Sequence, residues 1–356
     1  MPKIALLTTG GTIAGMSSGD PHRDSEGHSV RGYRAGALSG RDLLEQVGGL
    51  EDIADIELEE LAGIDSVEMN PGNWVDFAEH MFPYIERPDI DGIVLTHGTD
   101  TMAWTAMALA MQLQNPGKPI ILTGAMLPPD QALDHVKLHL RASTYLAAHS
   151  GIDEVSVCFS GNPESTFTEL YHAARVVKYA ASAWNAFSNP IEEPLATFKG
   201  GKLTRNPKAP QRSEEGLPKL VKGFVPITQV TYVIGASPLP NNGNERGVLL
   251  DIPGRVGNNQ RVYDYAFCAL ARGIPVAITG ESGEYQNMPT EKELSLLRAG
   301  AAFMGRLNPH KAGVKLAWAI AQTRGDIFST RTLMYKDIAG ELAGLQLSPT
   351  YVGIRS

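Results

Sequence analysis

Short apolar runs alternate along the first half of the chain with segments in which apolar residues recur every three or four positions. The runs are unbroken, as in strands buried on both faces, and the other segments have helical spacing. Alternation at this spacing predicts a parallel sheet with right-handed crossovers. The expected strands are 4–7, 56–61, 91–96, 119–123 and 154–159, and the expected helices are 39–47, 73–85, 101–113 and 135–149.

The composition changes between Ser188 and Lys222, where five prolines and Gly200-Gly201 interrupt every hydrophobic period. Such a segment predicts a connector. We therefore expect an α/β protein whose larger N-terminal domain, with a mainly parallel sheet flanked by helices, precedes a smaller C-terminal α/β domain. The expected boundaries are 1–190, 191–222 for the connector and 223–356. Within the last domain we expect strands at 229–234, 247–252 and 275–279, and helices at 263–271, 290–304 and 311–323.

One link in the C-terminal half does not fit a simple parallel sheet. Ser237–Arg246 joins the expected strands 229–234 and 247–252 and is rich in Pro and Asn. A parallel crossover normally needs a dozen or more residues and usually a helix, which these prolines exclude. Either the C-terminal sheet is locally altered here, or one of the two strands is wrongly predicted.

Composition narrows the class of protein. The 356 residues are 43% hydrophobic and 20% charged, enough for a large core and more than one domain. The net charge of -8 argues against nucleic acid and anionic membranes as partners. No apolar run approaches the roughly 20 residues that span a bilayer, and Met1-Pro2-Lys3 leads into a strand without a signal peptide. Both cysteines, Cys158 and Cys268, lie in apolar segments, so we expect a reduced, cytoplasmic setting.

The candidate chemistry begins after the first strand, where Gly10-Gly11 is followed by Thr12. Open α/β sheets bind ligands at the carboxyl ends of their strands. The glycines fit neither dinucleotide nor P-loop spacing, so a reactive hydroxyl is favoured over a phosphate site. Residues 16–32 are polar and without period, which predicts a mobile lid loop ending at Tyr33.

A second polar turn, Thr99-Asp100, follows the strand at 91–96. A threonine hydroxyl becomes nucleophilic when a base takes its proton, and a neutral lysine is one such base. Lys178 stands among small and apolar residues in Arg175–Ser182. The alternative is an ordinary lysine on a half-buried helix, with its charged end in solvent.

Two motifs resemble those of the bacterial-type L-asparaginase family, which includes asparaginase-glutaminases. They are Thr9-Gly-Gly-Thr-Ile-Ala14 and Thr96-His-Gly-Thr-Asp-Thr-Met102, and the similarity continues through 122–126 and 307–311. The resemblance implies hydrolysis of L-asparagine to L-aspartate and ammonia through an acyl-enzyme, without metal or organic cofactor. It also implies a homotetramer, a dimer of dimers whose sites lie between subunits.

Carried over by position, the resemblance assigns Thr12 as nucleophile and Tyr33 as the lid tyrosine in contact with it. Thr99, Asp100 and Lys178 match the catalytic triad, and Asp100 would also hold the substrate's α-ammonium group. Ser66 would bind the α-carboxylate. A neighbouring subunit would lend an Asn from Val256–Asn259, with Asn258 and Asn259 both open. The expected substrate-binding positions are Gly11, Asp65, Ser66, Gly98, Ala125 and Asn258.

Several features leave the substrate open. Val67 stands where some family members carry a polar residue, and segments 128–142 and 237–246 depart from the family pattern. The alternatives are a glutaminase-asparaginase, an amidase for another carboxamide, and a non-enzymatic small-molecule sensor. The tRNA-dependent amidotransferase subunit shares this core, but its extra N-terminal domain is not expected here, because the chain starts at the first strand.

The histidines and one acidic pair have ordinary explanations. His135 and His139 share a helical face at metal-ligand spacing, but no third ligand is evident, so zinc is disfavoured. His97 is expected to be buried and hydrogen-bonded rather than a general base. His22 and His28 are expected to be solvated, although they could make lid closure pH-sensitive. Glu291 and Glu293 suit a helix start, and one of them could instead reach a neighbouring site.

Overall fold

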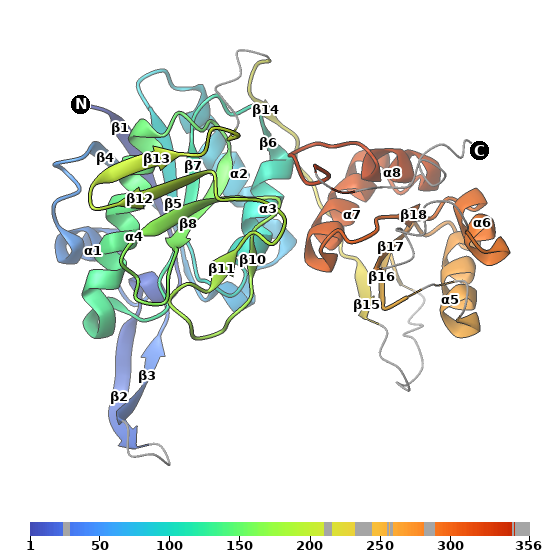
Figure 1. The fold of residues 1–356 in the computed structure, drawn as a ribbon, viewed down its shortest axis with the longest axis horizontal. Coiled ribbons are helices and arrows are strands. Elements are labelled where there is room, and N and C mark those ends of the chain that lie inside the picture. The colour runs from blue at the N-terminus through green and yellow to red at the C-terminus, as the bar shows by residue number, and fades with distance from the viewer. Residues whose placement is uncertain are drawn as a thin grey trace. The chain divides into compact units, whose positions relative to one another are not determined.

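The chain divides by its contacts into two compact units, Met1–Val221 and Lys222–Ser356. The structure, a computed structural model (Figure 1), describes residues 1–23, 29–209, 216–231, 244–254, 256, 259–280, 289–343 and 345. Each unit has an α/β architecture of its own. The expected fold class is confirmed.

The first unit is built on an eight-stranded sheet in the order β13-β12-β9-β8-β7-β5-β1-β4. Five neighbouring strands, β8, β7, β5, β1 and β4, pair in parallel, and β9, β12 and β13 add antiparallel strands at one edge. The strand bounds are β1 Lys3–Gly10, β4 Asp55–Ile64, β5 Gly92–Thr96, β7 Ile120–Thr123, β8 Val155–Ser160, β9 Thr168–His172, β12 Ala196–Lys199 and β13 Lys202–Arg205.

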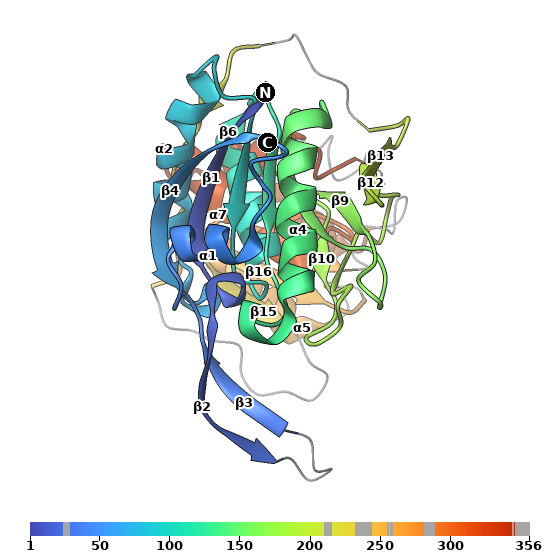
Figure 2. The same cartoon turned by 90° about the vertical axis from the view of Figure 1, so that its left-hand side faces the viewer.

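Helices cover both faces of this sheet (Figures 1 and 2). On one face, Leu43 and Leu140 pack into a core with Ile4 and Leu6 of β1. On the other, α2 and α3 contact each other, and α3 lies against β7 and β8. Alternate residues of each buried strand therefore enter two cores, which explains why these strands read as unbroken apolar runs. The helix bounds are α1 Gly40–Val47, α2 Pro71–Glu86, α3 Met102–Gln112 and α4 Pro129–His149.

The expected lid loop 16–32 is wrong in its secondary structure. It contains an antiparallel hairpin of β2 (Met16–Arg23) and β3 (Ser29–Arg34). Figure 2 shows the hairpin projecting from the sheet. At its base the Ser17 hydroxyl accepts a hydrogen bond of 2.7 Å from Gln131 at the start of α4. The two strands pair through their backbones, and the segment carries no hydrophobic period that would have predicted them.

The expected connector 191–222 also contains regular structure. Its residues 196–205 form the β12–β13 hairpin, and β12 pairs with β9 at the sheet edge. Two shorter pairings complete the first unit, between β10 and β11 and between β6 and β14. Edge strands need burial on one side only, so the prolines and charges around them misled the prediction. The bounds are β6 Leu113–Gln114, β10 Val177–Lys178, β11 Phe187–Ser188 and β14 Lys219–Leu220.

The second unit contains a four-stranded parallel sheet in the order β15-β16-β17-β18. The first two strands pair directly, so a strand lies at each of the two expected places. Residues 232–234 of the first expected strand, and most of the unusual link, lie outside the described residues. The expected helix 290–304 is too long, because Gly300, at a φ of 103°, turns the chain into β18. The bounds are β15 Thr228–Thr231, β16 Val248–Ile252, β17 Val276–Gly280, β18 Ala302–Phe303, α5 Gln260–Ala271, α6 Glu291–Arg298, α7 Pro309–Thr323 and α8 Ile327–Met334.

Candidate active site

The candidate site is built where the turns after β1, β4 and β5 nest together. These strands are neighbours in the parallel sheet, so their carboxyl ends meet at one edge. Gly11 has a φ of 74°, and a Cβ on it would lie 2.4 Å from the Gly98 nitrogen. A Cβ on Gly98 would in turn lie 2.5 Å from the Ser66 Oγ. Only glycine lets the three turns approach this closely.

Thr12 follows the first of these turns and begins a short 3₁₀ helix, Thr12–Ala14. Its side chain is buried, and its Oγ1 donates a hydrogen bond of 3.2 Å to the hydroxyl of Tyr33. Tyr33 lies on β3, near the base of the hairpin, and is 44% exposed. The expected nucleophile and the expected lid tyrosine are therefore in direct contact.

Lys178 joins the two residues of the second motif. Its Nζ donates hydrogen bonds to Thr99 Oγ1 at 2.9 Å and to Asp100 Oδ1 at 2.6 Å. The lysine side chain is only 14% exposed, whereas that of Asp100 is 55% exposed. Lys178 lies on strand β10 and not on a half-buried helix. A buried hydroxyl, an amine and a carboxylate are thus connected in a row, as proton transfer to or from Thr99 would require.

The hairpin of Lys178 is secured by a residue from the expected connector. Glu192 forms an ion pair with Arg175, two residues before β10, and accepts 3.0 Å from Asn189 Nδ2 just after β11. Sequence reasoning did not find Glu192. A carboxylate among prolines carries no sequence pattern that separates it from a solvated surface residue.

Five of the six residues expected to bind substrate follow the carboxyl ends of neighbouring strands in the first unit: Gly11, Asp65, Ser66, Gly98 and Ala125. Ser66 is buried in a 3₁₀ turn that Asp65 caps through its carboxylate, 3.2 Å from the Val67 nitrogen. The Ser66 carbonyl accepts 2.7 Å from the Thr101 hydroxyl. Ala125 is fully buried just after β7. Asn258 lies outside the described residues, and Asn259 caps α5 through the Val262 nitrogen at 3.2 Å.

His97 is buried within the second motif and is hydrogen-bonded through both ring nitrogens, as expected. Its Nδ1 lies 2.7 Å from the Gly98 carbonyl, and its Nε2 lies 3.0 Å from Thr105 Oγ1. Trp74 Nε1 donates a hydrogen bond to the same Thr105 oxygen. Burial lowers the pKa of His97 to about 4. The neutral ring donates to Gly98 from Nδ1 and so holds the turn before Thr99.

The other histidines and the acidic pair lie away from these motifs or outside the described part. His135 and His139 are both buried, and no group of three or more His, Cys, Asp or Glu among the described residues could hold a metal. The side chains of His22 and His28 are not described. Glu293 completes a capping box at the start of α6, accepting 2.8 Å from the Thr290 nitrogen. Over the part of the chain that is described, no helix is long and apolar enough to cross a membrane.

The class of enzyme, an amidohydrolase, follows from comparison with known proteins. Residues 3–211 match the family model described as Asparaginase, N-terminal. That span is more than half of the 356 residues, so the chain belongs to the asparaginase family. The resemblance found in the two threonine motifs is thereby confirmed.

Individual relatives differ in what they are named for. The L-asparaginase of Thermococcus kodakarensis is 30% identical over 355 residues, 96% of this chain and 99% of that protein. A glutamyl-tRNA(Gln) amidotransferase subunit of Methanobrevibacter smithii is 31% identical over 361 residues, 95% of this chain and 76% of that protein. Both similarities extend over nearly the whole of this chain, so sequence identity alone does not choose between the two kinds of relative.

Solved structures agree with the family. The thermostable L-asparaginase from Thermococcus kodakarensis superposes with a TM-score of 0.77 at 28% identity, covering 96% of this chain and 99% of that one. A probable cytoplasmic L-asparaginase from Campylobacter jejuni gives a TM-score of 0.73 at 25% identity, covering 95% and 100%. Amidohydrolase activity follows from the family; the particular amide does not.

Proposed function

We propose that this protein hydrolyses L-asparagine to L-aspartate and ammonia, with Thr12 as the nucleophile. The observation that carries the proposal is the contact of Lys178 with both Thr99 and Asp100 in the same unit as the Thr12 turn. The similarity to an L-asparaginase over nearly its whole length supports the choice of substrate.

The first half of the reaction forms an acyl-enzyme. Thr12 Oγ1 attacks the side-chain carboxamide carbon, while Tyr33, which accepts the Thr12 hydrogen bond, orients the hydroxyl. Backbone N–H groups of the glycine turns stabilise the oxyanion. The amide nitrogen leaves as ammonia with the proton that Thr12 has lost.

The second half returns the enzyme to its starting state. Water attacks the acyl carbon and loses a proton towards Thr99 and Lys178. Lys178 accepts a proton as a neutral amine, and Asp100, 2.6 Å away, holds the ammonium that forms. The bond to Thr12 Oγ1 then breaks, and the proton restores its hydroxyl. No metal or organic cofactor is used in either half.

Substrate binding uses the remaining residues at the sheet edge. Ser66 takes the α-carboxylate and Asp100, exposed on its outer side, takes the α-ammonium group. Gly11, Gly98 and Ala125 line the pocket with backbone, and Asp65 fixes the Ser66 turn through its cap. Asn258 of a neighbouring subunit completes the site in a cytoplasmic homotetramer, a dimer of dimers.

A second candidate is supply of ammonia for tRNA-dependent amidation. The specific observation in its favour is the 31% identity to a glutamyl-tRNA(Gln) amidotransferase subunit over 95% of this chain. The same acyl-enzyme chemistry serves both candidates. They differ in the use of the ammonia: in the first candidate it is a product of amino-acid hydrolysis, and in the second it is passed on for amidation of a tRNA-bound amino acid.

Ammonia release from L-asparagine and L-glutamine tests the proposal. The native enzyme should release ammonia from L-asparagine, and Thr12→Ala should abolish release while Thr204→Ala, on the exposed edge of β13, leaves it unchanged. Full activity in Thr12→Ala would refute the nucleophile. Release from L-glutamine at an equal rate would favour a glutaminase-asparaginase, and none from either amide by folded protein would favour the second candidate or another carboxamide.

A further inference from the structure

A continuous chain of hydrogen bonds runs through the interior of the first unit to the carbonyl of Gly124. His139 Nδ1 lies 2.6 Å from that carbonyl, and His139 Nε2 lies 2.8 Å from Ser160 Oγ. Ser160 Oγ lies 2.7 Å from Ser165 Oγ, which lies 2.8 Å from His135 Nδ1. None of these residues belongs to the threonine motifs, and the two histidines fall in the segment that departs from the family pattern.

The donor and the acceptor of each hydrogen bond in this chain can be assigned by starting from the Gly124 carbonyl. A carbonyl only accepts, so His139 carries its proton on Nδ1. Burial lowers the pKa of His139 to about 4, so the ring is neutral at pH 7. Its Nε2 therefore has no proton and accepts a hydrogen bond from the Ser160 hydroxyl. Ser160 has no second proton and accepts from Ser165, which accepts from His135 Nδ1. Every donor therefore points toward Gly124, and such chains strengthen each member.

Gly124 is the point at which this chain reaches the candidate site. A Cβ on Gly124 would lie 2.4 Å from the His97 carbonyl and 3.3 Å from Thr99 Cγ2. The His97 nitrogen donates 2.8 Å to the carbonyl of Thr123, the residue before Gly124. The backbone of this turn is thus packed directly against the second threonine motif. A shift of Gly124 would move Thr99.

The other end of the chain reaches the hairpin that carries Lys178. The ring of Trp184, in the turn between β10 and β11, lies 4.3 Å from the ring of His135, centroid to centroid. The His135 ring lies 4.1 Å from that of His139. Thr99 and Lys178 share a hydrogen bond at the site. The segments that carry them are connected through the same pair of histidines, His135 and His139.

Ser165 is held in an unusual conformation for its part in this chain. Its φ of 51° is left-handed, which residues with a Cβ rarely adopt. Its hydroxyl takes part in two hydrogen bonds of the chain, and its nitrogen donates 3.1 Å to the Asn162 carbonyl. These contacts offset the backbone strain, as expected where a strained residue serves a function.

We infer that His139 is a positioning residue for amide hydrolysis, which it supports by holding Gly124 against the Thr99 turn and, through His135 and Trp184, the Lys178 hairpin. This inference rests on the proposed function, since it names a further residue of the same site. The ring itself touches neither Thr99 nor Lys178 in any described contact. Its effect passes through the backbone of Gly124, which packs against Thr99 Cγ2, whereas Ala125 enters the pocket only with its backbone. We therefore expect a larger change in kcat than in KM.

Three substitutions of His139 separate its two hydrogen bonds. His139→Leu fills the space and removes both, and should lower kcat by about 10- to 100-fold with KM within about 3-fold, because small displacements of reacting groups cost this much. Asn places its amide nitrogen near the Nδ1 position, where it can donate to the Gly124 carbonyl; Gln places its amide oxygen near the Nε2 position, where it can accept from the Ser160 hydroxyl. His139→Asn should recover most of kcat, and His139→Gln should not.

The matched control is His149→Gln, which removes an exposed histidine from the same helix. It should leave kcat unchanged. Equal kcat for the native enzyme and His139→Leu would overturn the inference, as would better recovery by Gln than by Asn. A change in KM alone would assign His139 to substrate binding instead and would also overturn it.

Two variants of Ser165 test the chain if His139→Leu fails to fold. Ser165→Ala removes the hydroxyl and keeps the strained backbone, whereas Ser165→Gly removes the hydroxyl and relieves the strain. Both should lower kcat to a similar extent if the hydroxyl matters. A normal kcat in Ser165→Gly would contradict the chain.

A readout other than activity keeps this inference separate from the proposed function. Amide hydrogen exchange should rise at residues 120–126 and 177–188 in His139→Leu, and less at 120–126 in His139→Asn. If the native enzyme releases no ammonia, the proposed function fails, but the exchange pattern still tests the coupling. Unchanged exchange in both segments of His139→Leu would overturn it.

Discussion

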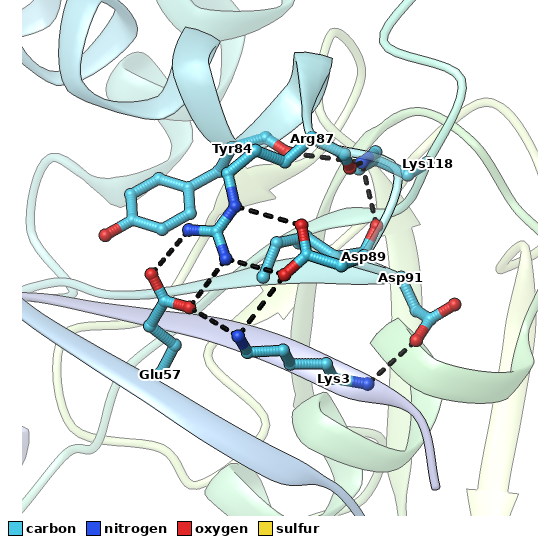
Figure 3. Close-up of polar contacts among 8 residues, drawn as sticks. Lys3, Glu57, Tyr84, Arg87, Asp89, Asp91 and Lys118 are labelled. Carbon is cyan, nitrogen blue, oxygen red and sulfur yellow. Dashed lines mark hydrogen bonds and ion pairs between the residues drawn. The ribbon is translucent and has the colours of Figure 1, made fainter.

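The two edges of the central sheet use charge in opposite ways. At the carboxyl edge, Lys178 is bonded to one hydroxyl and to one exposed carboxylate. At the amino edge, Figure 3 shows Lys3 and Arg87 in a closed network with Glu57 and Asp89. The lysine at the first edge has one charged partner, whereas Lys3 at the second has two, and hydrogen bonds to Glu57 and Asp89 raise the pKa of Lys3.

The amino-edge network is built for pairing. Arg87 contacts both oxygens of Glu57, at 2.6 and 2.9 Å, and both of Asp89, at 3.1 and 2.7 Å. Nearby, Lys118 Nζ donates to three backbone carbonyls at the end of α2 and before β5, at 2.7 to 3.1 Å (Figure 3). These bonds join β1, β4, α2 and β5 at their ends. We therefore expect the fully paired network to matter for stability and Lys178 to matter for the reaction.

The largest expected effect is on activity, from Lys178→Met. Removing the amine leaves no base for Thr99, so kcat should fall by about 10²- to 10⁴-fold, with the melting temperature near that of the native enzyme. Ammonia release and thermal melting measure the two. The matched variant Lys3→Met should lower the melting temperature and leave kcat near that of the native enzyme. An equal loss of activity in both variants would contradict the distinction between the two edges.

Tyr33→Phe should have a smaller effect on the same reaction. The hydroxyl accepts the Thr12 hydrogen bond, and losing one such contact in the reacting complex costs about 10-fold in kcat or more. Steady-state kinetics with L-asparagine measures it. An unchanged kcat would mean that the contact of the two hydroxyls has no part in the rate.

Arg87→Met should affect stability and leave activity alone. Four hydrogen bonds to two carboxylates are lost, but the groups are partly exposed and screened, so the melting temperature should fall by about 2 to 4 °C. The kcat should stay within about 2-fold, since losses from the site would be far larger. A large loss of activity would show that the two edges are coupled through the sheet.

The smallest effect is a dependence of stability on pH. Hydrogen bonds from Arg87 and Lys3 lower the pKa of Glu57 to about 2 from 4.5. A carboxyl group with a lowered pKa stabilises the folded state above the unfolded value, so this contribution is complete above about pH 4.5 and disappears as the pH falls toward 2. The difference in melting temperature between native protein and Glu57→Gln should shrink across this window. A constant difference would contradict the assignment.

Sequence reasoning succeeded where burial dictates the pattern. The strand at Gly92–Thr96 is buried throughout, and its apolar run defines it. The hairpins β2–β3 and β12–β13 were missed because backbone pairing at an edge leaves no such pattern. The helix predicted at 290–304 is shorter in the structure, because Gly300 has a positive φ that turns the chain out of the helix. The sequence does not show which glycine adopts such a conformation.

By itself, the sequence determined the α/β class, the family and the two threonine motifs, because buried strands and glycine turns each require particular residues in a row. The tertiary structure alone decided which distant residues meet them: Lys178 with Thr99, Glu192 with Arg175, and His139 with Gly124. Contacts between residues far apart in the chain depend on strand order and hairpin placement. The identity of a single lysine, glutamate or histidine in a sequence gives no information about strand order or about where a hairpin lies.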